Sequence, residues 1–259
     1  MLLAIDVGNT NTVMGVFDGA EMRDSWRIKS DARNTADELA LAFRGLVADT
    51  PITGIAACST VPAVLRELRT MLSRYYAGVP TVLVEPGVRT GVSVLTDNPK
   101  EVGTDRICNT AAAYHLTGGP CIVVDFGTST NFDVISSRGD FLGGALAPGI
   151  EISLDALAAR AAQLRKVELV APRSPIGKNT VESLQSGILY GFAGQVDGMV
   201  RRLSAAVAPD DPASVHVIAT GGLASLVIDH SDTVTRYEPS LTLLGLRLIY
   251  ERALPPPRT

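Results

Sequence analysis

One short pattern occurs twice along the chain at a constant offset, and this repeat constrains the fold more than any other feature. Residues 4–10 (AIDVGNT) and 123–129 (VVDFGTS) each join an apolar strand to an Asp, an apolar residue, a Gly and a turn of hydroxyl or amide side chains. Both copies enter a second strand, at 12–17 and 131–136, followed by a turn and a third strand. Such a duplication predicts two structurally related domains that face one another and hold a ligand between them.

The other segments alternate between predicted helices and strands. Helices are expected at 35–47, 62–76, 105–116, 182–203 and 241–253, and further strands at 2–7, 25–29, 54–58, 81–84 and 216–220. This alternation is typical of an α/β protein with mixed sheets flanked by helices. The TGGP segment at 117–120 is the best candidate boundary and predicts domains at 1–117 and 118–259. We expect the last helix to pack back on the first domain.

The charge balance argues against some classes of partner. The net charge is −4 and the isoelectric point is about 5.4, so the chain lacks the basic excess of proteins that bind nucleic acid or anionic membranes. We therefore expect small-molecule chemistry, with no nucleic acid and no membrane as partner. The start MLLAIDVGN lacks a basic segment and reaches Asp6 too early for a signal peptide, and no apolar run approaches the ~20 residues of a membrane span. A cytoplasmic protein is expected.

The cysteines and histidines give no sign of a metal site or a disulfide framework. Cys58, Cys108 and Cys121 lie far apart in the sequence without a CxxC pair, which favours neither disulfides nor a zinc site. The three histidines are isolated from other ligand-type residues. A solvated or core position is therefore favoured for each of them over metal ligation.

The first repeat carries groups that suit a phosphate and its metal ion. Asp6 lies at the end of a strand, Gly8 allows close approach of the backbone, and Asn9 and Thr10 supply hydrogen-bonding groups. A P-loop is a poor match, because no Lys follows the last Gly. The alternative is an ordinary hairpin, for which Asn and Gly are favoured. Taken alone, the Gly-Gly pair at 221–222 is equally typical of a plain strand-to-helix turn.

Together these elements resemble a known group of proteins. In order along the chain, the turns at Asp6, Asp125 and Gly221 are similar to the two phosphate motifs and the adenosine motif of acetate and sugar kinases, actin and heat-shock ATPases. Further segments resemble type III pantothenate kinases in particular: DVGNT at 6–10, NPKEVGTDR at 98–106, GGA at 143–145 with PG at 148–149, and GKNT at 177–180. These segments span nearly the whole chain.

The resemblance implies a fold and an activity. The fold would be two related ribonuclease H-like domains, as in actin-like ATPases, with the nucleotide site in the cleft between them. The activity would be ATP-dependent phosphorylation of pantothenate to 4′-phosphopantothenate, the first step of coenzyme A biosynthesis. The implied cofactors are ATP with Mg²⁺ and a monovalent cation, K⁺ or NH₄⁺. Because members of the resembling family are dimers, and the 182–203 helix is rich in glycine, we expect a homodimer.

The resemblance also assigns individual residues to roles. Asp105 matches the catalytic general base of the family, and Arg106 matches a residue that binds the substrate. The substrate-binding residues that the resemblance implies are Gly103, Thr104, Asp105, Arg106 and Thr180. Contacts with ATP and its phosphates are implied for Asp6, Val7, Gly8, Asn9, Thr10, Asn11, Thr12, Val13, Thr128, Gly221 and Gly222. Asp125 matches a ligand of the monovalent cation, and Asp6 lies on the magnesium side.

Some of these residues have plainer interpretations from the sequence alone. Thr104 or Asp105 would cap the following helix, and the helix dipole would make Asp105 a weak base. Asn179 with Glu182 is typical of a helix N-cap with a reciprocal partner. Thr96 occupies a position at which the family often has an aromatic residue. Because of this difference, the sequence does not determine the local shape of the substrate pocket.

Two other functions remain as alternatives. One is a kinase of the same superfamily that acts on another small acid or sugar, because a fold does not fix a substrate. The other is a nucleotide-binding regulator without turnover.

Overall fold

The computed structural model describes residues 1–160 and 167–254. The chain divides into two compact units. The first unit contains residues 1–93 and 97–112 and the segment that begins at Leu241; the second contains residues 94–96 and the described part of 113–240.

The first unit is built on a mixed five-stranded sheet. Its strands are β1 (Leu2–Val7), β2 (Asn11–Asp18), β3 (Glu21–Lys29), β4 (Gly54–Ser59) and β5 (Thr81–Leu83). They lie in the order β3-β2-β1-β4-β5; β2 is antiparallel to β1 and β3, and β4 is parallel to β1 and β5. β3 begins earlier than the expected residue 25, because the charged residues of this edge strand, among them Arg23 and Asp24, hide its apolar alternation.

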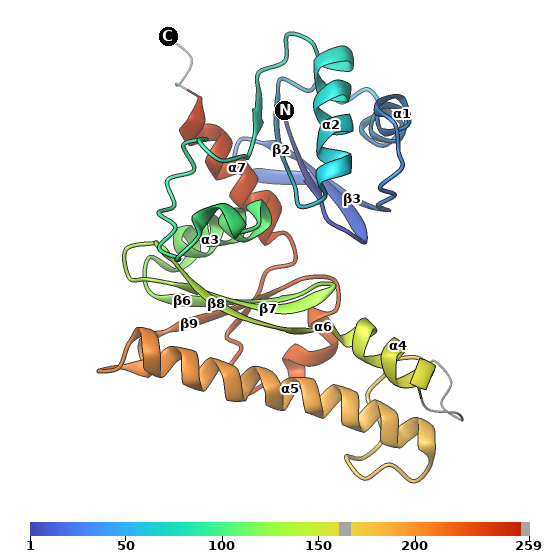
Figure 1. The fold of residues 1–259 in the computed structure, drawn as a ribbon, viewed down its shortest axis with the longest axis vertical. Coiled ribbons are helices and arrows are strands. Elements are labelled where there is room, and N and C mark those ends of the chain that lie inside the picture. Colours follow the sequence, from blue (N-terminus) through green and yellow to red (C-terminus); the bar gives the residue numbers. More distant parts are fainter. Residues whose placement is uncertain (161–166, 255–259) are drawn as a thin grey trace. The chain divides into compact units, whose positions relative to one another are not determined.

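The second unit repeats this arrangement. Its strands are β6 (Cys121–Phe126), β7 (Ser129–Ile135), β8 (Phe141–Pro148), β9 (His216–Thr220) and β10 (Arg236–Tyr237). The order is β8-β7-β6-β9-β10, and β6 pairs antiparallel with β7 and parallel with β9, as β1 does with β2 and β4. The duplication predicted from the two Asp-x-Gly segments is therefore present in the fold (Figure 1).

Helices flank the first sheet. They are α1 (Ala36–Val47), α2 (Pro62–Tyr75), the first part of α3 (Thr104–Thr117) and α7 (Leu241–Ala253), with a 3₁₀ turn at Pro99–Glu101. α1 begins at a capping box, in which the Thr35 hydroxyl accepts from Glu38 N and the Glu38 carboxylate accepts from Thr35 N at 2.8 Å. α3 ends at Thr117, where the domain boundary is expected, whereas the units divide inside α3 between Ala112 and Ala113.

Apolar side chains cover both faces of the first sheet. On β1, Leu3, Ile5 and Val7 share a core with α1 and α2, whereas Ala4 faces a second core that includes residues of α3 and α7. Successive side chains of a strand point to opposite faces. Asp6 therefore lies on the face of Ala4, at the carboxyl end of β1.

In the second unit a long helix covers the sheet. The helices are α4 (Ile150–Arg160), α5 (Thr180–Val207) and α6 (Ala224–Val227), with 3₁₀ turns at Pro212–Ser214 and Ile228–His230. Figure 1 shows α5 running along one side of the sheet formed by β6 to β9. Its buried face carries Leu189, Phe192, Val196 and Val200 at helical spacing, packed with strand residues such as Val124.

One buried carboxylate fixes a loop beside this sheet. Asp197 of α5 accepts hydrogen bonds from the hydroxyls of Ser231 (2.7 Å) and Thr233 (2.8 Å) and from the backbone N–H groups of Asp232 and Thr233. Burial alone would raise the pKa of Asp197, but these donors outweigh it and hold the pKa below its usual range. The ionised carboxylate thereby anchors the loop that leads to β10.

Candidate active site

The Asp6 segment forms the tight turn between β1 and β2. Gly8 N donates to Asn11 O at 3.0 Å, which closes the turn, and Asn9 and Thr10 are exposed at its tip. Thr12 is buried, and its hydroxyl lies 2.9 Å from the Ser30 hydroxyl. The turn is thus a hairpin, as the plainer interpretation expects, and it also presents amide and hydroxyl groups beside a carboxylate. The two interpretations are compatible.

Asp105 lies in the first turn of α3. Gly103 O accepts from Ile107 N, so Gly103 takes the N-cap position, and Thr104 and Asp105 are the first residues inside the helix. The expectation that Thr104 or Asp105 caps the helix is therefore wrong. Thr104 Oγ1 instead donates to the carbonyl of Ser59, at the end of β4, at 3.4 Å.

The basicity of Asp105 also differs from the expectation. Burial raises the pKa of its carboxyl, and this effect exceeds the opposing ones, from the Arg106 N–H that donates to Asp105 Oδ1 at 2.9 Å and from the Arg106 guanidinium. The sequence argument from the helix dipole predicted the reverse, because burial of a carboxyl cannot be read from local sequence. Asp105 is therefore a stronger base than an exposed aspartate.

Asp6 and Asp105 come together around one thiol. Cys58 of β4 is paired in register with Asp6, and its Sγ donates to Asp6 Oδ1 at 3.3 Å. A hydrogen bond with Cys108, burial, and the negative charges of Asp6 and Asp105 raise the pKa of the Cys58 thiol well above its usual value. The first unit thus gathers both predicted acids at the carboxyl ends of β1 and β4.

Cys58, Ser59 and Cys108 are the residues of this cluster that sequence reasoning missed. No local signal marks them, because Cys58 and Ser59 end an apolar strand and Cys108 lies in a helix. The strand register between β1 and β4 is what brings Cys58 to Asp6, and it joins segments far apart in the chain.

The second unit holds the counterpart cluster. Asp125 is next to last in β6, and Thr128 is exposed in the following turn, which the Gly127 N–H closes by donating to Ser129 O at 3.0 Å. Gly221 has φ of 93°, and a Cβ there would lie 2.6 Å from Asp125 Oδ1. The Gly221 turn therefore packs its backbone directly against the Asp125 carboxylate, with Gly222 exposed beside it.

Thr180 is the first residue of α5 and is exposed. The preceding Asn179 is the N-cap, and its side chain accepts from Glu182 N at 2.9 Å. In return, the Glu182 carboxylate accepts a hydrogen bond from the Lys178 backbone N–H at 3.0 Å. It also accepts one from the Arg173 guanidinium at 2.7 Å. The predicted cap is confirmed, with the return bond one residue earlier than in a capping box; the contact of Thr180 with substrate stays a prediction.

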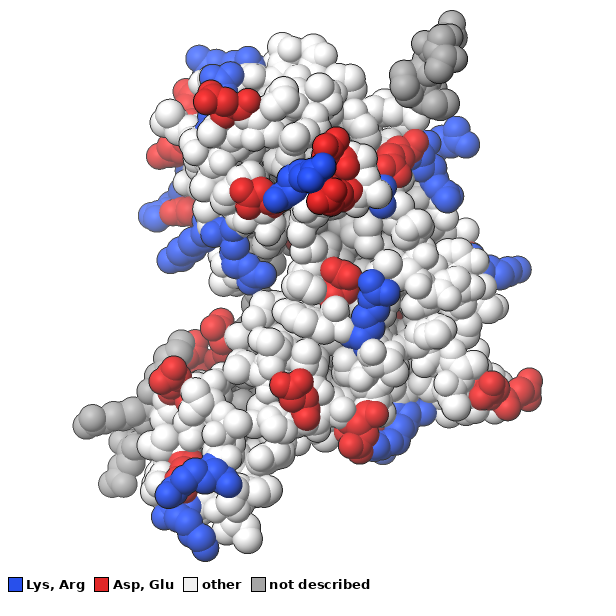
Figure 2. Space-filling model, turned by 180° about the vertical axis from the view of Figure 1, so that it is seen from behind, with Lys and Arg blue, Asp and Glu red and all other residues white. Residues whose placement is uncertain are grey.

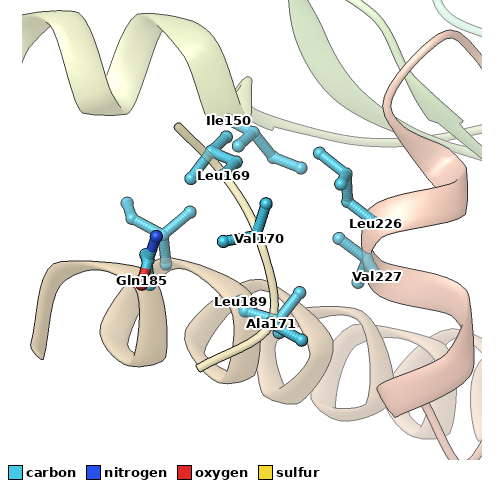
Figure 3. Close-up of a pocket in the computed structure, with 9 residues that line it drawn as sticks. Ile150, Leu169, Val170, Ala171, Gln185, Leu189, Leu226 and Val227 are labelled. Atoms are coloured by element: carbon cyan, nitrogen blue, oxygen red, sulfur yellow. The ribbon is translucent and has the colours of Figure 1, made fainter. Parts of the chain in front are cut away.

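A separate apolar pocket lies in the second unit between α4, α5, α6 and the segment 169–171. Figure 3 shows side chains of Ile150, Leu169, Leu226 and Val227 around it, with Gln185 as a polar member. The Gln185 amide donates to Glu168 O at 2.8 Å. None of the predicted site residues lines this pocket.

The surface shown in Figure 2 carries acidic and basic groups interspersed, often side by side, rather than a broad field of one sign. In the parts of the chain that the structure describes, no helix combines the length and the apolar character that crossing a membrane requires.

Solved structures with low sequence identity share this fold. A conserved protein from Campylobacter jejuni, described as a Baf family transcriptional activator, aligns over 96% of this chain and 98% of its own, with a TM-score of 0.61 at 18% identity. A Listeria monocytogenes protein described as an N-acetylmannosamine kinase aligns over 97% and 98%, with a TM-score of 0.56 at 16% identity. These likenesses show the two-domain actin-like ATPase fold of mixed sheets flanked by helices.

Sequence comparison is more specific. The family model described as type III pantothenate kinase matches residues 2–202. Curated proteins of that name are 66% identical in Frankia alni, over 97% of this chain and 99% of that protein, and 60% identical in Streptomyces coelicolor, over 97% and 98%. A family match of this extent, with relatives of this identity and coverage, shows that the chain belongs to the type III pantothenate kinase family.

Proposed function

We propose that this enzyme transfers the terminal phosphoryl group of ATP to the primary hydroxyl of pantothenate and forms 4′-phosphopantothenate for coenzyme A biosynthesis. The family match supports the reaction. The structural observation that best supports this proposal is the first turn of α3. There Asp105, whose pKa is raised, directly precedes Arg106, and the charges of Asp105 and Asp6 both act on the Cys58 thiol. Phosphate transfer to a panel of pantothenate, a sugar and a short-chain acid tests the choice of acceptor.

The α3 turn offers two complementary contacts for pantothenate. The Asp105 carboxylate is proposed to accept the proton of the attacking hydroxyl, and its raised pKa favours this step. The Arg106 guanidinium is proposed to bind the pantothenate carboxylate through a planar two-pronged contact. Phosphoryl transfer depends mainly on alignment and charge neutralisation, so an aspartate that orients the hydroxyl is sufficient as a base. Gly103, Thr104 and Thr180 are proposed to complete the substrate site.

The Asp6 turn is proposed to hold the phosphates of ATP. Residues 6–13 combine a carboxylate at a strand end with exposed amide and hydroxyl groups of Asn9 and Thr10. This donor set fits Mg²⁺, which usually keeps several waters and takes one or two protein carboxylates along with substrate phosphates. Bound Mg²⁺ would neutralise charge on the phosphates. Asp6 is the residue that would hold it or its water ligands.

The second-unit cluster is proposed to bind the rest of ATP and a monovalent cation. Thr128 would contact phosphate, and Gly221 and Gly222 would pack against adenosine. Because these two glycines have no side chains, they would allow adenosine to approach the backbone closely. The partly buried Asp125 carboxylate is proposed as the ligand of K⁺ or NH₄⁺, because hard cations prefer oxygen ligands.

The cation proposal predicts a specific loss in Asp125→Asn. Wild-type turnover is expected to fall when K⁺ is replaced by Na⁺, and the Asn variant is expected to be slow in both salts, because it lacks the anionic ligand. Steady-state rates at constant ionic strength measure this. Asp229→Asn, which removes one exposed carboxylate from the same unit, is the matched control and should keep the K⁺ response. A wild-type enzyme indifferent to the exchange would contradict the proposal.

We also propose that the enzyme is a homodimer joined through the second unit. α5 carries Gly187, Gly191 and Gly194 on an exposed side, and a Cβ at any of them would meet open space. The same unit also exposes large apolar side chains: Leu146, Ile152, Leu157, Val170, Ile176 and Val181. Small residues permit close approach of helices, and large exposed apolar side chains favour association.

Gly191→Glu is expected to yield a folded monomer. The new side chain has room in the single chain and raises helix propensity by roughly 0.5–1 kcal/mol, but it would place a charge in the proposed interface. Light scattering gives the mass and thermal unfolding the stability. Gly45→Glu in α1, another exposed helical glycine with open space around it, is the matched control and should leave a dimer. A wild-type monomer at micromolar concentration would refute the dimer.

A further inference from the structure

The Cys58 side chain is placed against the predicted magnesium side of the site. Cys58 lies on β4, directly across from Asp6 on the parallel strand β1, and has no exposed surface. Its Sγ donates to Asp6 Oδ1 at 3.3 Å. A thiol is a weak donor, but inside the protein even a weak bond restricts how a carboxylate can turn.

The Cys58 thiol has a single proton, which it donates in the hydrogen bond to Asp6. A neutral, buried thiol is neither a nucleophile nor a metal ligand. What it can offer Asp6 is one hydrogen-bond donor.

The plainer role for Cys58 is packing. Every residue of β4 is buried, and cysteine often serves as a small apolar core residue. A packing role depends on volume alone, whereas a positioning role depends on the donor. Ser and Ala at position 58 separate the two, because Ser keeps a donor and Ala does not.

We propose that Cys58 is a positioning residue of the phosphoryl-transfer site: its thiol orients the Asp6 carboxylate toward the magnesium-bound phosphates of the nucleotide. This inference rests on the proposed role of Asp6. It assigns no chemistry to Cys58 itself, which acts only through Asp6.

Calorimetric titration with ADP, with and without Mg²⁺ and in the absence of pantothenate, tests the proposal. Cys58→Ala is expected to bind Mg·ADP about 3- to 10-fold more weakly, the effect of losing one hydrogen bond, while Cys58→Ser binds within about twofold of wild type. ADP without Mg²⁺ should bind all three proteins alike. In steady state, the Ala variant should show a raised KM for Mg·ATP and an unchanged KM for pantothenate.

Matched variants keep the outcomes distinct. Cys121→Ala removes an equally buried cysteine from β6 of the second unit and should leave nucleotide binding unchanged. If the Ala variant at 58 does not fold, Cys58→Val replaces it, since it fills the space without a donor. Equal affinities of the Ala and Ser variants, or an equal loss in Cys121→Ala, would overturn the inference. A wild type that binds Mg·ADP without phosphorylating pantothenate would instead refute the proposed function, and the comparison at position 58 would still decide the role of the thiol.

Discussion

Asp105→Asn is expected to lower kcat for pantothenate phosphorylation by about 100-fold or more, while the affinity for ATP changes by less than about twofold. The Asn side chain has the same size and can still accept the Arg106 N–H, but it cannot take the proton of the substrate hydroxyl. Single-turnover rates and nucleotide titrations separate the two quantities. Undiminished turnover would remove Asp105 from the mechanism.

The same variant has a predicted effect on stability, whose sign follows from the raised pKa of Asp105. A raised pKa means that the folded protein holds the proton more tightly than the unfolded chain does. The folded state is therefore favoured below the unfolded pKa and loses that advantage as pH rises through the folded pKa. At neutral pH the ionised Asp105 destabilises the fold, and Asp105→Asn should have a Tm equal to or above that of wild type.

A matched variant distinguishes this effect from a general loss of helix stability. Asp37 is also in the first turn of a helix, α1, but it is exposed and accepts from Arg74 at 2.8 Å. Asp37→Asn should lower stability slightly, by about 0.3–1 kcal/mol, and leave turnover unchanged. A clearly lower Tm for Asp105→Asn at neutral pH would show that Asp105 stabilises the helix and would contradict the destabilising effect expected of its ionised form.

Gly221→Ala is expected to weaken ATP binding about tenfold or more and to lower the free energy of unfolding by roughly 2 kcal/mol or more. At φ of 93° an alanine is strained, and its Cβ would lie 2.6 Å from both Asp125 Oδ1 and Phe126 O. Relief of this clash would move the Gly221 turn away from the end of β6. Nucleotide titration and urea unfolding measure the two effects.

Gly78→Ala separates backbone strain from the clash. Gly78 has φ of 86°, similar to that of Gly221, but a Cβ there meets open space. This variant should lose only about 1 kcal/mol of stability and keep wild-type ATP affinity. Equal behaviour of the two variants would mean that contact between Gly221 and the Asp125 cluster has no part in nucleotide binding.

Local patterns predicted much of the fold. The repeated Asp-x-Gly segments and the strands around them predicted β1, β2, β6 and β7, and the helical patterns predicted α1, α2, α5 and α7. The sequence did not predict α4 or the two-residue β10. β10 is too short for any alternation to be visible, and its existence depends on pairing with β9.

The candidate site could be predicted only where local motifs mark it. Recognisable sequence motifs contain Asp6, Asp105, Asp125 and Gly221. No motif links Cys58 to Cys108 or to the acids, because the two cysteines lie far apart in the sequence. The register of β4 on β1 and the packing of α3 bring them together. For the same reason the raised pKa of Asp105 was missed: burial is a property of the fold, and the helix dipole, the one effect visible in the sequence, has the opposite sign.

The measurement that tests the central claim most directly is transfer of radiolabelled phosphate from ATP to pantothenate in the presence of Mg²⁺, with wild type and Asp105→Asn side by side. Labelled phosphopantothenate from the wild type, and about 100-fold less from the variant, is the predicted result. A folded wild-type protein that binds ATP but leaves pantothenate unlabelled would contradict the proposed function.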